Sequence, residues 1–273
     1  MNHEVTLTMR IKDILLKTVA STGKGIAAVM IIVLSFFLLS VSHAYADIIY
    51  ENDFEYDADL SGWTISDDSA GALDIDTIPY GWTSFLGEFG EYDAVSLTLT
   101  GLSEGWLTLS FDVFFIRSWD GNDPVYGVDY FTVMANDMIL LNETFSNGNQ
   151  AGQSYGDDSE KIIGYNDDGT AIYEAMTGSE LQWALGYWFE DGIYPENSDW
   201  MDSVYTFVYT FNNIDETLIL TFASNSWQDI TDESWGLDNV SVELSSVPEP
   251  ATLLLLASGA FGLIPLSRRR KRN

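Results

Sequence analysis

Residues 94–116 read AVSLTLTGLSEGWLTLSFDVFFI, and apolar and polar side chains alternate through most of this stretch. Successive side chains of a β-strand point to opposite faces of the sheet. The alternation therefore predicts two strands that each bury one face. The residues expected on the buried faces are Val95, Leu97, Leu99, Leu107, Leu109, Phe111 and Val113.

Similar runs occur further along the chain. Residues 129–145 predict a hairpin with its turn at 135–137. Residues 203–211 and 217–222 flank a loop rich in Asn and acidic residues, which predicts a second hairpin, and residues 237–244 are expected to form the last strand. Short strands separated by Gly, Asn and Asp predict an all-β domain, a β-sandwich of the jelly-roll kind.

Residues 147–202 depart from this pattern because they contain long polar stretches. We interpret them as a loop-rich insertion between strands of the sandwich, and long loops often carry binding function. Within this insertion, residues 179–189 (SELQWALGYWF) predict a short helix with Ser179 as its N-cap and Glu180 in its first turn.

The N-terminal residues 1–46 have the organisation of a signal peptide. Basic residues precede an apolar core at 26–39, and Ala44 and Ala46 form an A-x-A cleavage site. We therefore expect a mature chain that begins at Asp47. An uncleaved N-terminal anchor is the alternative.

The C-terminal residues 247–273 also have three parts. An apolar segment at 251–266 would form a helix about 24 Å long, slightly short of a bilayer core of roughly 30 Å. The basic cluster at 268–272 would stay on the cytoplasmic side of a membrane. A plain short anchor would account for these two parts alone. In front of them stands a distinctive motif, Val247, Pro248, Glu249 and Pro250.

The order of these parts resembles the PEP-CTERM sorting domain of bacterial exosortase substrates. The resemblance covers residues 247–273 and implies a Gram-negative bacterium that makes exopolysaccharide. It also implies that exosortase, a membrane-embedded peptidase, cleaves near the Pro-Glu-Pro motif. The protein would be anchored in the inner membrane before this processing and would reach the cell surface or the extracellular biofilm matrix after it.

The ectodomain between these two segments, residues 47–246, is strongly acidic. It holds only Arg117 and Lys161 of the 11 basic residues but 39 of the 42 acidic ones, so its formal net charge is −37. Nucleic acid is not an expected partner, because its binding depends on Lys and Arg at phosphates. A surface of this charge attracts cations, and carboxylate oxygens are ligands that suit calcium.

Cysteine is absent, and both histidines, His3 and His43, lie in the predicted signal peptide. The mature chain therefore lacks the side chains for Ser-His-Asp or Cys-based hydrolysis and for zinc held by Cys or His.

Two stretches of the ectodomain resemble known jelly rolls. Residues 52–63 contain Asn-Asp-Phe-Glu and Gly-Trp, and residues 233–240 read ESWGLDNV. Both are similar to concanavalin-like and galactose-binding-like domains, including MAM domains and several carbohydrate-binding modules. The resemblance implies that the first and last strands lie side by side and that calcium pins them, with Glu55 and Asp238 as ligands. The alternative is an exposed Glu55 and an Asp238 that accepts a hydrogen bond from a turn.

A second group of acidic residues is formed by Asp120, Asp123 and Asp129, in a stretch that resembles other PEP-CTERM ectodomains. We consider it a further candidate calcium site, with Asp120 and Asp129 as the ligands. Carboxylates on a solvated surface are the alternative.

A third acidic group, Glu51, Asp53 and Glu55, would occupy one face of a strand and resembles the carboxylates of retaining β-glucanases. Such enzymes need two carboxyl groups about 5–5.5 Å apart. The group lies at the start of the mature chain, however, whereas those enzymes carry it deep in the domain. We therefore expect no catalytic residues and no enzyme, with a surface glycoside hydrolase as the alternative.

The insertion contains several aromatic residues, and aromatic rings stack on the apolar faces of sugars. They are candidates for a glycan-binding platform, and a cover for the edge of the sandwich is the alternative. The sequence thus favours an exported structural or adhesive protein that binds exopolysaccharide or another glycan. The candidate platform residues are Trp183, Tyr187, Trp188 and Trp200.

Overall fold

The structure, a computed structural model, describes residues 47–56, 58–66, 72–148, 151–188, 201–226 and 228–245. The predicted signal peptide and sorting segment, with Ala44, Ala46 and Val247 to Pro250, lie outside these residues, and so does Trp200. Among the residues it describes, no helix is long and apolar enough to cross a membrane.

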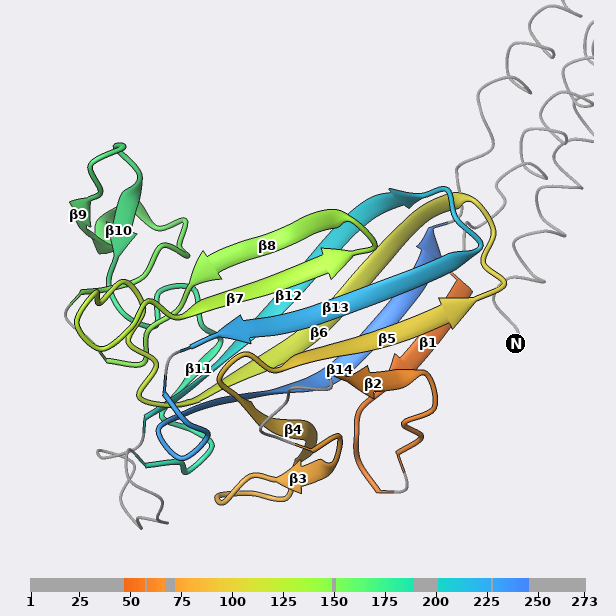
Figure 1. Ribbon diagram of the computed structural model, residues 1–273, viewed down its shortest axis with the longest axis horizontal. Helices are drawn as coiled ribbons and strands as arrows, with labels where there is room; N and C mark the ends of the chain where they lie inside the picture. The colour runs from red at the N-terminus through yellow and green to blue at the C-terminus, as the bar shows by residue number, and fades with distance from the viewer. Residues whose placement is uncertain are drawn as a thin grey trace, which may run out of the picture. The chain divides into compact units, whose positions relative to one another are not determined.

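Two antiparallel sheets form the domain (Figure 1). The first has seven strands, of which six follow in the order β11 (Leu181–Gln182), β12 (Asp202–Asn213), β6 (Gly105–Arg117), β14 (Glu233–Ser245), β4 (Ser84–Gly90) and β3 (Ile75–Thr77). The seventh strand, β1 (Asp47–Asn52), also pairs with β14. The second sheet has the order β2 (Trp63–Ile65), β5 (Ala94–Thr100), β13 (Thr217–Asn225), β7 (Tyr130–Ala135) and β8 (Met138–Thr144).

The central strands follow the order of a jelly roll. They run β4-β14-β6-β12 in the first sheet and β5-β13-β7-β8 in the second, so the chain passes repeatedly from one sheet to the other. This double Greek-key arrangement of eight strands is the jelly-roll topology. It confirms the fold class that the alternating sequence predicts.

The core lies between the two sheets. Val95 and Leu97 on β5 are buried, and so is the predicted row on β6, although Leu99 near the end of β5 is only partly buried. Large aromatic residues join them, among them Trp63, Phe222 and Trp235. A smaller apolar cluster covers the outward face of the first sheet and contains Ile78, Phe85, Phe114, Ile116, Leu185, Tyr187 and Val204.

The insertion between β8 and β12 contributes little regular structure. Its described part holds a 3-10 turn, η1 (Ser159–Lys161), and a small hairpin of β9 (Ile162–Tyr165) and β10 (Ala171–Tyr173). Figure 1 shows this hairpin beyond the end of the sandwich at which β7 and β14 begin.

One predicted hairpin is wrong. β12 and β13 are adjacent in sequence, but β12 pairs with β6 over its whole length, whereas β13 pairs with β5 and β7 in the other sheet. The loop after Asn213 therefore crosses between the sheets. A short loop between two alternating runs is compatible with either connection, and only pairing with strands distant in sequence decides between them.

The predicted helix at 179–189 is also wrong where the structure describes it. Leu181 and Gln182 form β11, and the backbone N–H groups of Glu180 and Trp183 donate to carbonyls of β12. The next four N–H groups, at 184–187, donate to the carboxylate of Asp202. These donors are thus used by β12, so no helical hydrogen bonds can form.

Candidate functional site

The first and last strands lie side by side, as the resemblance implies. β1 pairs with β14, with Asn52 opposite Val240. Beyond β1, Phe54 takes a left-handed conformation with φ 48° and buries its ring in the core. Glu55 remains partly exposed and accepts a hydrogen bond of 3.1 Å from the backbone N–H of Ser84.

Asp238 lies on β14 beside this turn and is buried. Its Oδ1 accepts a hydrogen bond of 2.7 Å from the N–H of Asn239. Desolvation and, to a smaller degree, the negative charges of Asp112, Glu55 and Asp53 together raise the pKa of Asp238 to about 7, against the lowering effect of that hydrogen bond. Asp112 lies opposite Asp238 in the register of β6 and β14, and the charges of Glu55 and Asp53 also act on Asp238; we call these four residues, Asp53, Glu55, Asp112 and Asp238, the first acidic cluster.

These residues fit a hard cation by their chemistry. Asp112 faces Asp238 in the register of β6 and β14, and the four side chains offer only oxygen donors. Burial is the main cause of the raised pKa of Asp238, and repulsion by the neighbouring carboxylates adds to it, so a cation at Asp238 would lower the electrostatic cost of ionising it. Calcium at Glu55 and Asp238 stays a prediction.

A second acidic cluster, Asp120, Asp129 and Glu233, lies where β6 ends and where β7 and β14 begin. One carboxylate oxygen from each residue lies within 4.8 Å of the others. Asp129 and Glu233 are fully buried, and Asp120 is partly buried. The structure therefore brings together the predicted pair Asp120 and Asp129. It adds Glu233 and does not include Asp123, whose Oδ1 accepts from the N–H of Val125.

Hydrogen bonds orient this cluster. Asp129 Oδ2 accepts from the N–H of Asp120 at 2.5 Å, and Gln228 Nε2 donates to Asp120 Oδ2 and Glu233 Oε1 at 3.0 Å each. Desolvation, followed by the nearby charge of Asp129, raises the pKa of Glu233 to about 9. Desolvation also raises the pKa of Asp129, to about 6.

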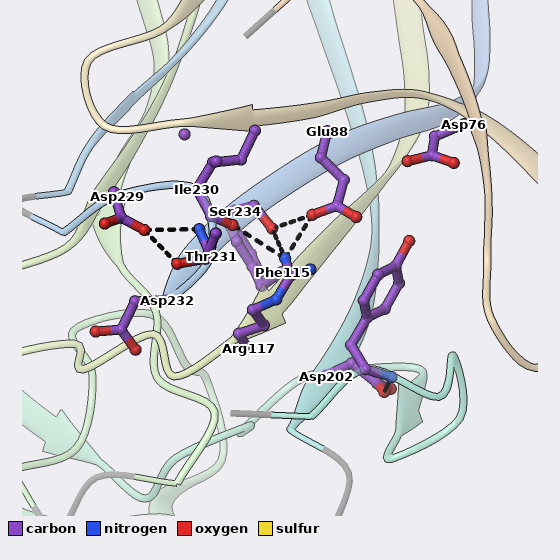
Figure 2. A network of polar contacts seen from close by, with 12 residues as sticks. Asp76, Glu88, Phe115, Arg117, Asp202, Asp229, Ile230, Thr231, Asp232 and Ser234 are labelled. Atoms are coloured by element: carbon purple, nitrogen blue, oxygen red, sulfur yellow. Dashed lines mark hydrogen bonds and ion pairs between the residues drawn. The ribbon is translucent and has the colours of Figure 1, made fainter. Parts of the chain in front are cut away.

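On the other face of β14 lies a network around Arg117, the last residue of β6 (Figure 2). Arg117 Nη1 donates to Glu88 Oε2 at 2.5 Å, to Ser234 Oγ at 2.6 Å and to the carbonyl of Ile230 at 3.1 Å. Its guanidinium also lies over the ring of Tyr187, 5.2 Å from the centroid. Because Glu233 and Ser234 are neighbours on a strand, their side chains point to opposite faces and serve two separate networks.

The candidate platform residues differ in their exposure. Trp183 is 49% exposed, but Tyr187 is buried beneath Arg117 and is not at the surface, which corrects our expectation for that residue. Trp188 is partly buried. Sequence reasoning missed two exposed aromatic residues, Tyr80 and Trp82, in the turn between β3 and β4. This turn contacts the insertion, because the N–H of Tyr80 donates to the carbonyl of Leu185.

The row of carboxylates that suggested a glycosidase does not form one continuous strand face. β1 ends at Asn52, and the left-handed Phe54 breaks the alternation on which the expectation depended. Glu51 instead lines an open cleft of about 420 Å³ together with residues that include Asp59, Ser61 and Thr100.

Comparison with protein families finds a PEP-CTERM protein-sorting motif at residues 246–271, which confirms the interpretation of the C-terminal segment. Comparison with curated proteins finds no match.

Similar solved structures include carbohydrate-binding modules. One is the CBM22-1 xylan-binding domain from Paenibacillus barcinonensis, at 16% identity and a TM-score of 0.33, with 76% of this chain and 99% of that domain covered. Another is a module of Cellvibrio mixtus lichenase 5A in complex with cellotriose, at 12% identity and a TM-score of 0.31, with coverages of 73% and 99%. A family 35 module from Clostridium thermocellum matches at 9% identity and a TM-score of 0.33, with coverages of 73% and 98%.

Proposed function

We propose that this chain, which carries a PEP-CTERM sorting motif at residues 246–271, is a non-enzymatic structural or adhesive protein of the cell surface or extracellular matrix. The sorting motif is the single observation that carries the proposal. In this proposal the N-terminal segment directs export, and the C-terminal segment holds the protein in the inner membrane of a Gram-negative bacterium until exosortase cleaves it.

The ligand class in this proposal is a glycan of the exopolysaccharide around the cell. Its support is a pair of exposed aromatic residues, Tyr80 and Trp82, in the turn between β3 and β4 of the first sheet. Trp82 is 94% exposed, Tyr80 is 65% exposed, and the turn that carries them is hydrogen-bonded to the segment that follows Trp183. Exposed rings held by backbone hydrogen bonds are suited to stacking on sugar rings.

Processing at the tail is tested by mass spectrometry of protein recovered from the outer cell surface. We expect no peptide that extends beyond about Pro250, because cleavage near the Pro-Glu-Pro motif removes the apolar segment and the basic cluster. The matched control is the same strain without its exosortase, in which peptides from 251–266 should be recovered from the membrane fraction. Intact protein on the outer surface that still ends in Asn273 would contradict the sorting proposal.

Glycan binding is tested by screening the purified protein on a glycan array and measuring the affinity for any hit. Replacing Trp82 or Trp183 by Ala should weaken binding by about tenfold, since a lost aromatic stacking contact is worth about 1 kcal/mol or somewhat more. Tyr126→Ala is the matched control, because Tyr126 is 62% exposed but lies in the turn before β7. Binding that is unchanged in both tryptophan variants would exclude this surface.

The same preparation separates the binder from a glycoside hydrolase. A non-enzymatic protein should release no reducing sugar from a panel of β-glucans. Hydrolysis by the wild type that is lost in Glu51→Gln or Glu55→Gln would instead identify an enzyme.

A further inference from the structure

The second acidic cluster contains two buried oxygens that lack a hydrogen-bond donor. Within the described part of the chain, Asp129 Oδ1 and Glu233 Oε2 have no partner, although both side chains are fully buried. A buried polar atom without a partner is costly, and a buried carboxylate more so. The two carboxyl groups lie close enough to hydrogen-bond to each other, but only if one of them keeps a proton, so these oxygens need either a proton or a cation.

Either a proton or a metal ion could meet this need. A single proton between Asp129 and Glu233 would join only those two residues and would leave Asp120 as a charge beside them. A cation can be coordinated by all three carboxylates at once. Oxygens that share a calcium at 2.3–2.6 Å lie no more than about 5 Å apart, a limit that the 4.8 Å spread of this cluster meets.

The charge of the site also favours a cation. Ion pairs among the described residues join Arg117 to Glu88 and Lys161 to Glu174, so neither of the two basic side chains neutralises this cluster. Gln228 supplies two N–H donors, but an amide carries no net charge. A divalent ion bound to all three ionised carboxylates would leave a net formal charge of only −1 at the site.

We propose that Asp120, Asp129 and Glu233 bind a divalent cation, with calcium as the ion that best suits three carboxylates. The ion would join the end of β6 and the start of β14, in the first sheet, to the start of β7 in the second. It would also stabilise the insertion, because the N–H of Asn122 donates to the carbonyl of Gly152 and the N–H of Asp129 to that of Gly121. This site is separate from the first acidic cluster and does not depend on the glycan or sorting proposals.

The site can be tested with the full-length chain, purified in detergent and stripped of metal with a chelator. Calcium binding would be measured by titration calorimetry, and terbium luminescence excited through tryptophan would serve as a local probe. Trp119 neighbours Asp120 in sequence, and its Nε1 donates to the carbonyl of Ser234 at 2.7 Å, so this indole lies close to the site. The wild type should bind calcium and should show sensitised terbium emission.

Glu233→Gln keeps the size of the side chain and removes its charge. It should lower the calcium stoichiometry by one ion per chain and abolish the terbium signal of this site. Asp120→Asn should do the same and provides a second variant at a less buried position, in case Glu233→Gln fails to fold. Glu104→Gln, at an exposed Glu in the turn before β6, is the matched control and should bind as the wild type does.

An unchanged stoichiometry in Glu233→Gln and Asp120→Asn would overturn the proposal and would leave a shared proton as the account of the buried pair. Loss of all calcium binding in Asp238→Asn, with no further loss in Glu233→Gln, would overturn it equally, since the first acidic cluster would then be the sole site.

Discussion

Arg117 shows what a single residue contributes in this acidic protein. Its side chain is 8% exposed and that of its partner Glu88 is 14% exposed, so the ion pair lies almost wholly out of water. Removing one partner of a buried ion pair leaves an uncompensated charge, which typically costs about 3–5 kcal/mol. The contacts to Ser234 and Tyr187 would be lost with it.

We therefore expect Arg117→Met to lower the free energy of unfolding by about 3–5 kcal/mol. The measurement is urea denaturation followed by tryptophan fluorescence. The double variant Arg117→Met, Glu88→Gln should recover part of the loss, because it removes the stranded charge. Lys161→Met is the natural control, since its ion pair with Glu174 is solvent-exposed and should matter little. Equal effects of the two Met variants would argue against a structural role for Arg117.

For single residues, the sequence shows which side chains could form a site better than it shows which of them come together in the fold. Asp120 and Asp129 could be paired in advance because they lie close together in the chain, and the structure does bring them together. Glu233 is over a hundred residues away, and only the register of β14 against β6 places it beside them. Tyr187 was misassigned because its ring packs beneath Arg117, a contact that its local sequence does not indicate.

Among the elements, β12 carries an aromatic ladder on its inward face. Tyr205, Phe207 and Tyr209 alternate along the strand, with neighbouring ring centroids 6.1 Å and 6.0 Å apart, and Tyr155 packs against Tyr205 at 5.6 Å. Desolvation raises the pKa of Tyr155, Tyr205 and Tyr209 above the ordinary value. The fold thus favours the neutral phenols.

These raised pKa values determine how the stability of the fold changes at alkaline pH. A pKa that is raised in the folded state contributes stability that is fully present below the unfolded value of about 10 and is lost as the pH rises through the folded value. We expect Tyr155, Tyr205 and Tyr209 to ionise only together with unfolding. Tyrosinate absorbance and circular dichroism, recorded on the same samples against pH, would check this. Complete ionisation in a still-folded protein would contradict it.

Elements were predictable where the periodic pattern alone decides them. β5, β6 and the hairpin of β7 and β8 follow from alternation and a short polar turn. The predicted hairpin after β12 failed because partner choice depends on strands far away in sequence. The predicted helix failed because the carboxylate of Asp202 takes four backbone N–H groups, a contact over some fifteen residues that no local propensity reports.

At the scale of the whole molecule, the first acidic cluster lies where β1 pairs with β14, in an ectodomain (residues 47–246) whose formal net charge is −37. An ion that binds only the folded state stabilises it by about 2.7 kcal/mol at a hundredfold excess over Kd. For a domain of this size, each kcal/mol raises Tm by about 2–4 °C. Calcium should therefore raise Tm by several degrees, because it offsets repulsion among carboxylates in a chain without disulfides.

The comparison is thermal melting in chelator and in millimolar calcium at matched ionic strength, since monovalent salt also screens the repulsion. Asp238→Asn should lose part of the rise, and the second acidic cluster should account for the remainder. Calcium at Asp238 would be ruled out if the wild type had the same Tm in chelator and in calcium. It would also be ruled out if calcium raised the Tm of Asp238→Asn as much as that of the wild type.

The pairing of β1 with β14 also determines how the domain responds to mechanical force. Asp47, at the start of β1, lies opposite Leu244, near the end of β14, so the chain enters and leaves at neighbouring points. Tension applied between these two ends acts across the strands and separates their hydrogen bonds one after another, as a zipper opens. The domain is therefore weak when it is stretched between its own termini.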